Sequence, residues 1–286
     1  MVFKIVTVAT HEDGYLPALR ILCKKSKIPL HILGYNQKWK GWNWRTQILI
    51  DFFEKCDISD IVMVIDGFDV LVLSNTEEII KKFKKFKCNI LFACSHVNVG
   101  QPYHTFFYKN IGFNLVKNYF KSKKKYILNA GSFMGYSKHI LQLYYQIQKK
   151  QKETGINDDQ VLLNRLILNF LKYKIDFHSK VFWIWENSSL NDYFSIFIRN
   201  HTLEHNDYIN YVDGRIVFDR NKNKPCVVHG INNRVLDNLC YKNNIILTQD
   251  HIKNISQGDV KNILYYSKIF ILVIIIIFMI YFLKKR

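Results

Sequence analysis

The sequence lacks several motifs that would assign it to a common protein class. Its six cysteines form no CxxC pair, which argues against a zinc ribbon, and several stand in apolar stretches typical of a core. No nucleic-acid-binding motif accompanies the net charge of +18, so we expect no nucleic-acid partner. Because 49% of the residues are hydrophobic, the chain has ample material for a packed core. A positive field of this kind would attract a diphosphate-bearing substrate.

The two ends of the chain differ in character. Residues 1–10 form an apolar, strand-like run with no small-residue cleavage site, so they do not read as a signal peptide. Residues 263–283 are apolar on all faces and about as long as a bilayer requires, which disfavours the alternative of a buried core helix. The sequence therefore predicts a domain over residues 1–240, a polar linker over 241–262, a transmembrane helix over 263–283 and a basic tail over 284–286.

The orientation of this predicted anchor has two interpretations. The positive-inside tendency places the basic residues 284–286 in the cytosol. The absence of a signal peptide favours a tail-anchored protein whose large domain is itself cytosolic. We expect the second arrangement, a single-pass membrane protein with a cytosolic domain.

Strand-like and helix-like segments alternate along the first part of the chain. Strands are predicted at 3–9, 30–34, 61–65 and 89–93, and helices at 16–25, 48–56 and 77–86. The run Ile61–Ile65 has no polar residue, as expected of a central parallel strand covered on both faces. This alternation predicts an α/β fold with a mostly parallel sheet flanked by helices, in which ligands bind at the carboxyl ends of the strands.

Two aspartates follow the apolar run 61–65 directly. Asp66 and Asp69 would both lie at the strand's carboxyl edge, where the chain leaves the sheet. Ionised carboxylates there need a cation or water, because burying bare charge is costly. Mg²⁺ and Mn²⁺ prefer carboxylate, water and phosphate oxygens, and a cation held there would neutralise a departing diphosphate. An ordinary acidic turn is the alternative, and this pattern alone does not decide between them.

A second pair of carboxylates, Asp158 and Asp159, precedes an apolar helix that begins near Val161. Negative charge is favourable at a helix N-terminus, so simple capping is one interpretation. The other is a carboxylate that faces a sugar, either as a general base for an acceptor hydroxyl or to stabilise positive charge at the anomeric carbon. The pair alone leaves both interpretations open.

Polar groups also end two later apolar runs. A strand is predicted to end at Asn129, whose amide offers both donor and acceptor groups for sugar hydroxyls. The small residues that follow suit a backbone packed tightly against a bound ligand. His229 ends another run, and a neutral imidazole can complete a metal site, although a lone histidine at a strand end is more often structural.

The order and content of six segments resemble the glycosyltransferase domain of the procollagen-lysine hydroxylases and related collagen glycosyltransferases. The segments are IVTVAT at 5–10 with Asp13-Gly14, ILGYNQKWKGW at 32–42, VIDGFDV at 64–70, LNAGSFMG at 128–135, NDDQ at 157–160 and VHG at 228–230. This resemblance implies the GT-A fold of nucleotide-diphospho-sugar transferases. It also implies a UDP-sugar donor, either UDP-glucose or UDP-galactose.

The resemblance implies three sets of site residues and a metal cofactor. The metal ligands would be Asp66, Asp69 and His229. The donor contacts would be Thr7, Thr10, Asp66, Gly230 and Asn232. The catalytic residues, which face the sugar and the acceptor, would be Asn129, Asp158 and Asp159. Mn²⁺ would be the usual ion, with Mg²⁺ as the alternative.

Departures from the family pattern show where the function could differ. The family's His-Gly-Asn-Gly reads His229-Gly230-Ile231-Asn232 here, and its longer acidic run is shortened to 157–159. The stretch 95–108 has no Trp, so the acceptor could differ from collagen hydroxylysine. We expect a hexosyltransferase that acts on a hydroxyl of a protein or glycan. The alternative is a non-catalytic, membrane-tethered sugar- or nucleotide-binding module derived from such a transferase.

Two short patterns point to other metal chemistries. The segment 201–205 matches the HxxEH pattern of zinc peptidases, but it has no evident third ligand and its flanks do not make a convincing helix. His11 and Asp13 match the HxD part of an iron facial triad, but no jelly-roll strand pattern follows. Neither pattern is supported by its surroundings.

Overall fold

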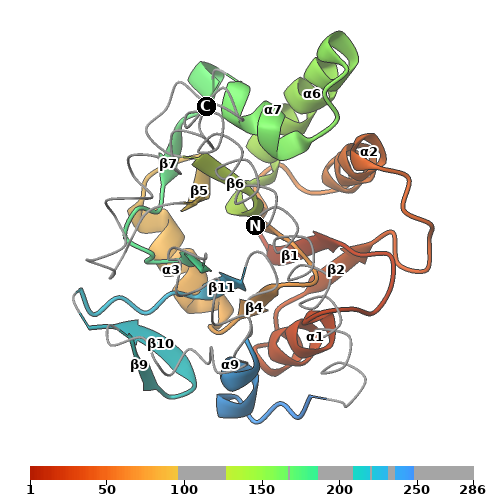
Figure 1. The fold of residues 1–286 in the computed structure, drawn as a ribbon. Helices are drawn as coiled ribbons and strands as arrows, with labels where there is room; N and C mark the ends of the chain where they lie inside the picture. Colours follow the sequence, from red (N-terminus) through yellow and green to blue (C-terminus); the bar gives the residue numbers. More distant parts are fainter. Residues whose placement is uncertain (96–126, 167, 186–208, 220, 231–235, 248–286) are drawn as a thin grey trace, which may run out of the picture.

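A six-stranded sheet forms the centre of the computed structural model, which describes residues 1–95, 127–166, 168–185, 209–219, 221–230 and 236–247 (Figure 1). In spatial order its strands are β2 (Leu30–Leu33), β1 (Phe3–Val8), β3 (Ile61–Ile65), β6 (Ile127–Tyr136), β5 (Ile90–Ser95) and β7 (Tyr173–Ile175). β1 is parallel to β2 and β3, and β5 is parallel to β7. Only β6 runs antiparallel to its neighbours β3 and β5. The prediction of a mostly parallel α/β sheet is confirmed.

β6 corrects one sequence prediction. The strand was predicted to end at Asn129, but it continues through the small residues to Tyr136 and pairs with β3 along that stretch. The cause is packing inside the sheet: a Cβ at Gly135 would lie 2.4 Å from the backbone oxygen of Asn89. Small residues here allow close strand contacts, so they do not mark the end of the strand.

Helices cover both faces of the sheet (Figure 1). On one face lie α1 (Leu16–Lys25) and α3 (Thr76–Lys85), and on the other α2 (Trp42–Phe53), α6 (Ser137–Thr154) and α7 (Asp159–Arg165). Alternate residues of β3 supply the two cores: Ile61, Met63 and Ile65 face α1 and α3, whereas Val62 and Val64 face α2 and α6. The apolar run 61–65 is therefore buried on both sides, as predicted.

A smaller, three-stranded sheet packs beside the first, and the last described residues of the chain lie in the same part of the fold. In spatial order its strands are β4 (Val70–Val72), β11 (Val227–Gly230) and β8 (Phe182–Trp185). The same part of the fold contains a separate hairpin, β9 (Ile209–Val212) and β10 (Arg215–Phe218), and the helix α9 (Asp237–Lys242). β11 is antiparallel to β4 and parallel to β8. Ile245 and Leu247 are buried in the core of this part, so the packed domain continues past the predicted boundary at residue 240.

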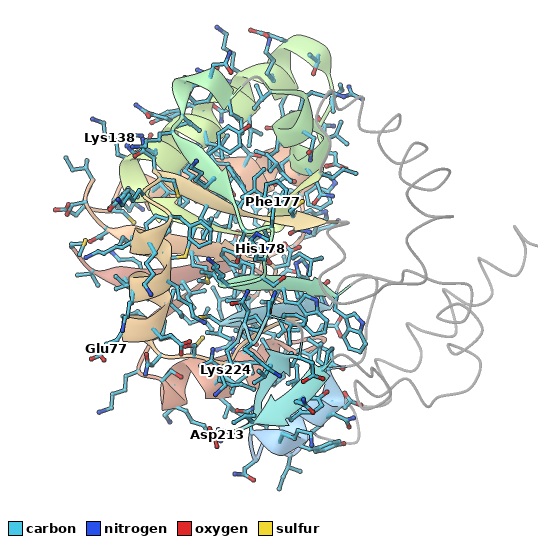
Figure 2. All side chains as sticks on the ribbon, turned by 90° about the vertical axis from the view of Figure 1, so that its left-hand side faces the viewer. Glu77, Lys138, Phe177, His178, Asp213 and Lys224 are labelled. Carbon is cyan, nitrogen blue, oxygen red and sulfur yellow. The ribbon has the colours of Figure 1, made fainter. Side chains whose placement is uncertain are left out.

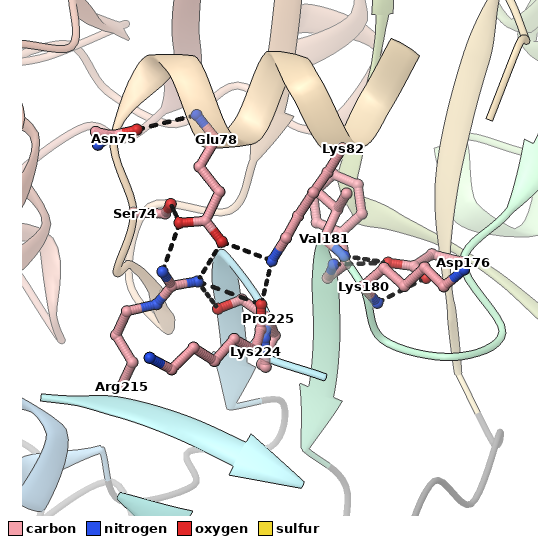
Figure 3. Close-up of polar contacts among 11 residues, drawn as sticks. Ser74, Asn75, Glu78, Lys82, Asp176, Lys180, Val181, Arg215, Lys224 and Pro225 are labelled. Atoms are coloured by element: carbon pink, nitrogen blue, oxygen red, sulfur yellow. Dashed lines mark hydrogen bonds and ion pairs between the residues drawn. The ribbon is translucent and has the colours of Figure 1, made fainter. Parts of the chain in front are cut away.

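A polar cluster fixes the small sheet to α3 (Figure 3). Glu78 accepts two hydrogen bonds from the Arg215 guanidinium, at 2.5 and 3.1 Å, and one from Ser74 at 2.6 Å. Arg215 and Lys82 also donate to the backbone oxygen of Lys224, which leads into β11. Burial acts to raise the pKa of Glu78. The hydrogen bonds from Arg215, Lys82 and Ser74 outweigh this effect and lower the pKa to about 2.

Among the predicted helices only α2 departs from its prediction by more than two residues, and two helices, α6 and α9, were not predicted. α1 spans the predicted residues, and α3 lies within one residue of its prediction. α2 begins at Trp42, earlier than predicted, and the eighteen-residue α6 was not predicted. Charged side chains such as Glu77, Lys138 and Asp213 point outward (Figure 2).

No helix in the described part of the chain has both the length and the apolar character needed to cross a bilayer. The segment 263–283, for which a transmembrane helix was predicted, lies outside the described residues. The predicted linker over 241–262 overlaps α9 and the buried residues at its start, and the rest of it is not described either. The anchor therefore stays a prediction.

Candidate metal and donor site

The three predicted metal ligands come together where the two sheets meet. Asp66 follows β3, Asp69 precedes β4, and His229 lies in β11. Pairing of β11 with β4 places His229 opposite Val70, and the backbone N–H of Gly230 donates to the oxygen of Asp69 at 2.8 Å. A short strand pair thus joins residues that are far apart in the sequence.

The ligand atoms of these residues are close enough for one ion. One donor atom from each of Asp66, Asp69 and His229 lies within 4.8 Å of the others, and no other such group of three occurs among the described residues. His229 Nε2 is 3.3 Å from Asp69 Oδ1 and 3.7 Å from Asp66 Oδ2. The His229 side chain is buried, whereas Asp66 and Asp69 keep 43% and 26% of their side-chain surfaces exposed. The cluster is therefore open to a ligand on the carboxylate side.

Two residues of β6 shape the metal side of the cluster. A Cβ at Gly131 would lie 1.9 Å from Asp66 Oδ2 and 2.9 Å from His229 Cε1, so only glycine leaves room for these side chains. Ser132 donates its hydroxyl hydrogen to the Gly131 oxygen at 2.7 Å and lies 3.0 Å from His229 Nδ1. If Ser132 keeps that hydrogen on the Gly131 oxygen, it accepts from Nδ1–H, and the Nε2 lone pair of a neutral His229 would then face the two aspartates.

A buried arginine, which sequence reasoning missed, connects the two carboxylate clusters. Arg45 in α2 is only 5% exposed, pairs with Asp159 through Nη1, and reaches Asp66 Oδ1 through Nη2 at 3.3 Å. Burial acts to lower the pKa of the guanidinium, but the neighbouring carboxylates, Asp159 foremost, hold it above its ordinary value. In the sequence Arg45 is only the lone basic residue of the helix Trp42–Phe53, which does not by itself indicate a function.

Burial raises the pKa of Asp66, an effect that Arg45 opposes and Asp69 reinforces. Nearly half of its side-chain surface is nevertheless exposed, so the carboxylate is accessible to solvent and to a cation. Bringing Asp66 and Asp69 together as anions favours occupation of the site by a cation.

The second carboxylate pair divides into two roles. Asp158 is the N-cap of α7 and accepts from the backbone N–H of Val161 at 3.0 Å, so the capping interpretation is correct for this residue. Asp159 is 4% exposed and is held by Arg45. Gln151 of α6 supports the loop before α7 by donating to the oxygen of Asn157 at 2.7 Å.

The remaining predicted residues have varied surroundings. Asn129 is buried, and its side-chain oxygen accepts from the N–H of Gly131 at 2.9 Å. The hydroxyl of Thr7 is buried and has no hydrogen-bond partner among the described residues, whereas Thr10 contacts the ring of the exposed His11. Gly67 lies next to this hydroxyl: a Cβ added there would be 3.0 Å from Thr7 Oγ1. Asn232 lies outside the described residues.

Tryptophans at the start of α2 form an exposed cluster beside Arg45. Trp39 packs edge-on against Trp42 and Trp44, with ring centroids 5.4 and 5.5 Å apart. Trp39 and Trp42 each keep 43% of their surface exposed, and the Arg45 guanidinium lies 5.9 Å from the Trp42 ring. Large apolar rings next to a polar site provide a flat surface on which planar or sugar rings can stack.

The competing metal patterns gain no support. His11 Nε2 and Asp13 Oδ2 are 3.7 Å apart on the surface, but no third ligand completes a cluster with them in the described chain. The HxxEH segment at 201–205 lies outside the described residues.

Comparison with known proteins gives several partial matches. Human multifunctional procollagen lysine hydroxylase and glycosyltransferase LH3 is 26% identical over 244 residues, which cover 79% of this chain but only 29% of the human protein. The Caenorhabditis elegans protein of that description is 27% identical over 62% of this chain and 25% of its own length. Protein R699 of Acanthamoeba polyphaga mimivirus is 24% identical over 62% of this chain and 38% of its own. The chain thus spans well under half the length of these relatives.

A crystal structure of a glycosyltransferase involved in glycosylation of the major capsid of PBCV-1 superposes with a TM-score of 0.48 and 11% identity, covering 86% of this chain and all of that one. A family model described as the PLOD GT domain matches residues 1–247. Because this match covers most of the chain, the protein belongs to the PLOD glycosyltransferase-domain family.

Proposed function

We propose that this protein is a metal-dependent hexosyltransferase that moves glucose or galactose from a UDP-sugar to a hydroxyl group. The observation that carries the proposal is the convergence of Asp66, Asp69 and His229, whose ligand atoms lie within 4.8 Å of one another at the carboxyl end of β3. That edge of an α/β sheet is where nucleotides bind in folds of this kind.

The donor set fits a divalent cation. Arg45 pairs with the carboxylates of Asp66 and Asp159, while Asp69 lies beside His229, so these three carboxylates and one guanidinium have two excess negative charges when ionised. One divalent ion would balance them. Two carboxylate oxygens with one imidazole nitrogen suit Mn²⁺, with Mg²⁺ as the alternative, since Mg²⁺ prefers oxygen ligands. A bound cation would offset the charge that develops on a departing nucleoside diphosphate.

The chain's own residues would bind and orient the donor. The buried, unsatisfied hydroxyl of Thr7 lies beside Gly67 next to the aspartates, where a ligand would supply its missing hydrogen bond. The exposed rings of Trp39 and Trp42 offer a stacking surface at the same end of the sheet. In this proposal the roles of Thr10, Gly230 and Asn232 as donor contacts, and of Asn129 and Asp158 at the sugar, follow the family resemblance.

The acceptor is proposed from the relatives. Human LH3 and the nematode protein are described as procollagen lysine hydroxylases and glycosyltransferases, so a hydroxylysine-bearing, collagen-like peptide is the first acceptor to test. A second candidate function, a non-catalytic binding module, would keep metal and UDP binding without turnover.

The test is UDP release from a panel of UDP-sugars with Mn²⁺ and with EDTA. We expect turnover of UDP-glucose or UDP-galactose only with the metal, and its loss in Asp69→Ala. The matched control is Asp51→Ala, which removes an exposed aspartate of α2 whose partner is Gln47. Binding of Mn²⁺ and UDP without turnover of any sugar would favour the non-catalytic module, and unchanged turnover in Asp69→Ala would refute the site.

A further inference from the structure

Arg45 is the most unusual side chain of the described protein that the proposed reaction leaves without a role. It is an arginine 5% exposed in the first turns of α2, on the face that also buries Leu49. Removing a guanidinium from water is costly unless charged partners and hydrogen bonds compensate. Its partners are Asp159, which is equally buried, and Asp66. One cation therefore connects the helix α7 to the candidate metal site.

The two oxygens of Asp66 face different partners. Oδ1 lies 3.3 Å from Arg45 Nη2, while Oδ2 faces His229 Nε2 at 3.7 Å. Gly131 leaves space on the Oδ2 side only because it has no Cβ. With Oδ1 engaged by the guanidinium, the carboxylate plane is fixed and Oδ2 is the oxygen presented to the cluster of Asp69 and His229.

Asp159 is placed to hold the arginine, and it does so from a supported position. Asp158 caps α7, and Gln151 contacts both Thr46 Oγ1, at 3.1 Å, and the oxygen of Asn157. These bonds fix the loop before α7 against α2 and α6. Because Asp159 is only 4% exposed and its Oδ2 is bound by Arg45, it is poorly placed to take a proton from an acceptor hydroxyl.

We propose that Arg45 and Asp159 form one positioning pair, which holds Asp66 so that its Oδ2 alone is presented as a metal ligand. The inference rests on the proposed function, since it assumes that Asp66, Asp69 and His229 bind a divalent cation. It assigns Asp159 an indirect role, through Arg45, in place of contact with the sugar or the acceptor.

The direction of the change in Mn²⁺ affinity on removing Arg45 shows whether the residue positions Asp66 or only lies near the site. Arg45 is a positive charge next to a cation site, so Coulomb's law alone predicts that its removal tightens binding of Mn²⁺. A positioning role predicts the opposite, because outer-shell partners of metal ligands typically contribute about 10–100-fold to metal affinity. Lysine would restore the charge but not the planar fork that reaches two carboxylates, so it would not restore affinity.

The experiment is a titration of the full chain with Mn²⁺, in which free Mn²⁺ is followed by EPR, for wild type, Arg45→Met, Arg45→Lys and Asp159→Asn. We expect weaker binding by about 10–100-fold in Arg45→Met and Asp159→Asn, with no rescue in Arg45→Lys. A single variant can unfold because it leaves one buried charge without its partner. The double variant Arg45→Met/Asp159→Asn removes both charges of the pair, so it allows the measurement in that case. It should bind Mn²⁺ no more weakly than the worse single variant.

The outcomes separate the two proposals. Wild-type protein that binds no Mn²⁺ overturns the proposed function and this inference together. Wild-type binding with equal or tighter binding in Arg45→Met overturns the inference alone, as does full rescue by Arg45→Lys. An additive loss in the double variant would show that Arg45 and Asp159 act separately and would also overturn the pair.

Discussion

Replacing Gly131 by alanine tests the geometry of the metal site with the smallest possible change. The added Cβ would lie 1.9 Å from Asp66 Oδ2 and 2.4 Å from Asp66 Cγ, whereas real Cβ contacts are essentially never under 3.0 Å. The Asp66 carboxylate must therefore move by about 1 Å, and a shift of about 1 Å in a reacting group can cost on the order of 100-fold in rate. We expect turnover to fall by about that factor and Mn²⁺ affinity to fall with it.

The assay pairs Mn²⁺ binding, followed by EPR, with UDP release at saturating Mn²⁺. The matched control is Gly214→Ala in the β9–β10 turn, where glycine has a φ of +71° and a Cβ would lie 2.9 Å from Asn243 Oδ1. This variant should melt at a lower temperature but bind Mn²⁺ normally, since the strain is far from the ligands. Wild-type Mn²⁺ affinity and turnover in Gly131→Ala would show that Asp66 is not a ligand in the position described.

Three further predictions concern single side chains. Ser132→Ala should weaken Mn²⁺ binding about 10-fold, because His229 loses the acceptor that selects its tautomer; unchanged affinity by EPR would contradict this. Glu78→Gln should cost about 1–3 kcal/mol in urea unfolding at pH 7. Since the Glu78 pKa is lowered, that difference should vanish as the pH falls from about 4.5 toward 2, and persistence at pH 2 would argue against it. Asn75→Ala should cost about 1 kcal/mol by removing the α3 N-cap, measured in the same urea titration.

The elements with strong local patterns could be predicted from the sequence. β3 is a short, wholly apolar run, and α1 has regular helical spacing, so local composition determines both. β6 could not be bounded in this way, because Gly135 packs against a neighbouring strand and Gly131 leaves room for the side chains of Asp66 and His229, contacts that the sequence does not reveal. α6 has buried residues at helical spacing but follows β6 without a side-chain cap, so its start has no local signal.

In the candidate site, too, some residues have a local sequence pattern, whereas others are recognised only by their tertiary contacts. Asp66 and Asp69 follow a recognisable strand and His229 lies near the end of another, so local patterns made them candidates, and the family resemblance joined them into one metal site. Arg45 had no such signal, because a lone arginine in an apolar helix is identified as functional only when its partners are seen. Asp158 and Asp159 are adjacent in sequence, yet one caps a helix and the other binds Arg45, a distinction that depends on tertiary contacts.

The location of the ligands links metal binding to the packing of the two sheets. Asp66 belongs to the six-stranded sheet, whereas Asp69 and His229 are held by the pairing of β4 with β11 in the small sheet. An ion bound by all three would therefore cross-link the sheets, and any ligand that binds only the folded state raises its stability by mass action. The Glu78–Arg215 contact acts on the same strand from the other end, since Arg215 also binds the oxygens of Lys224 and Pro225 ahead of β11. Loosening that contact should weaken metal affinity as well as stability, because both depend on where β11 lies.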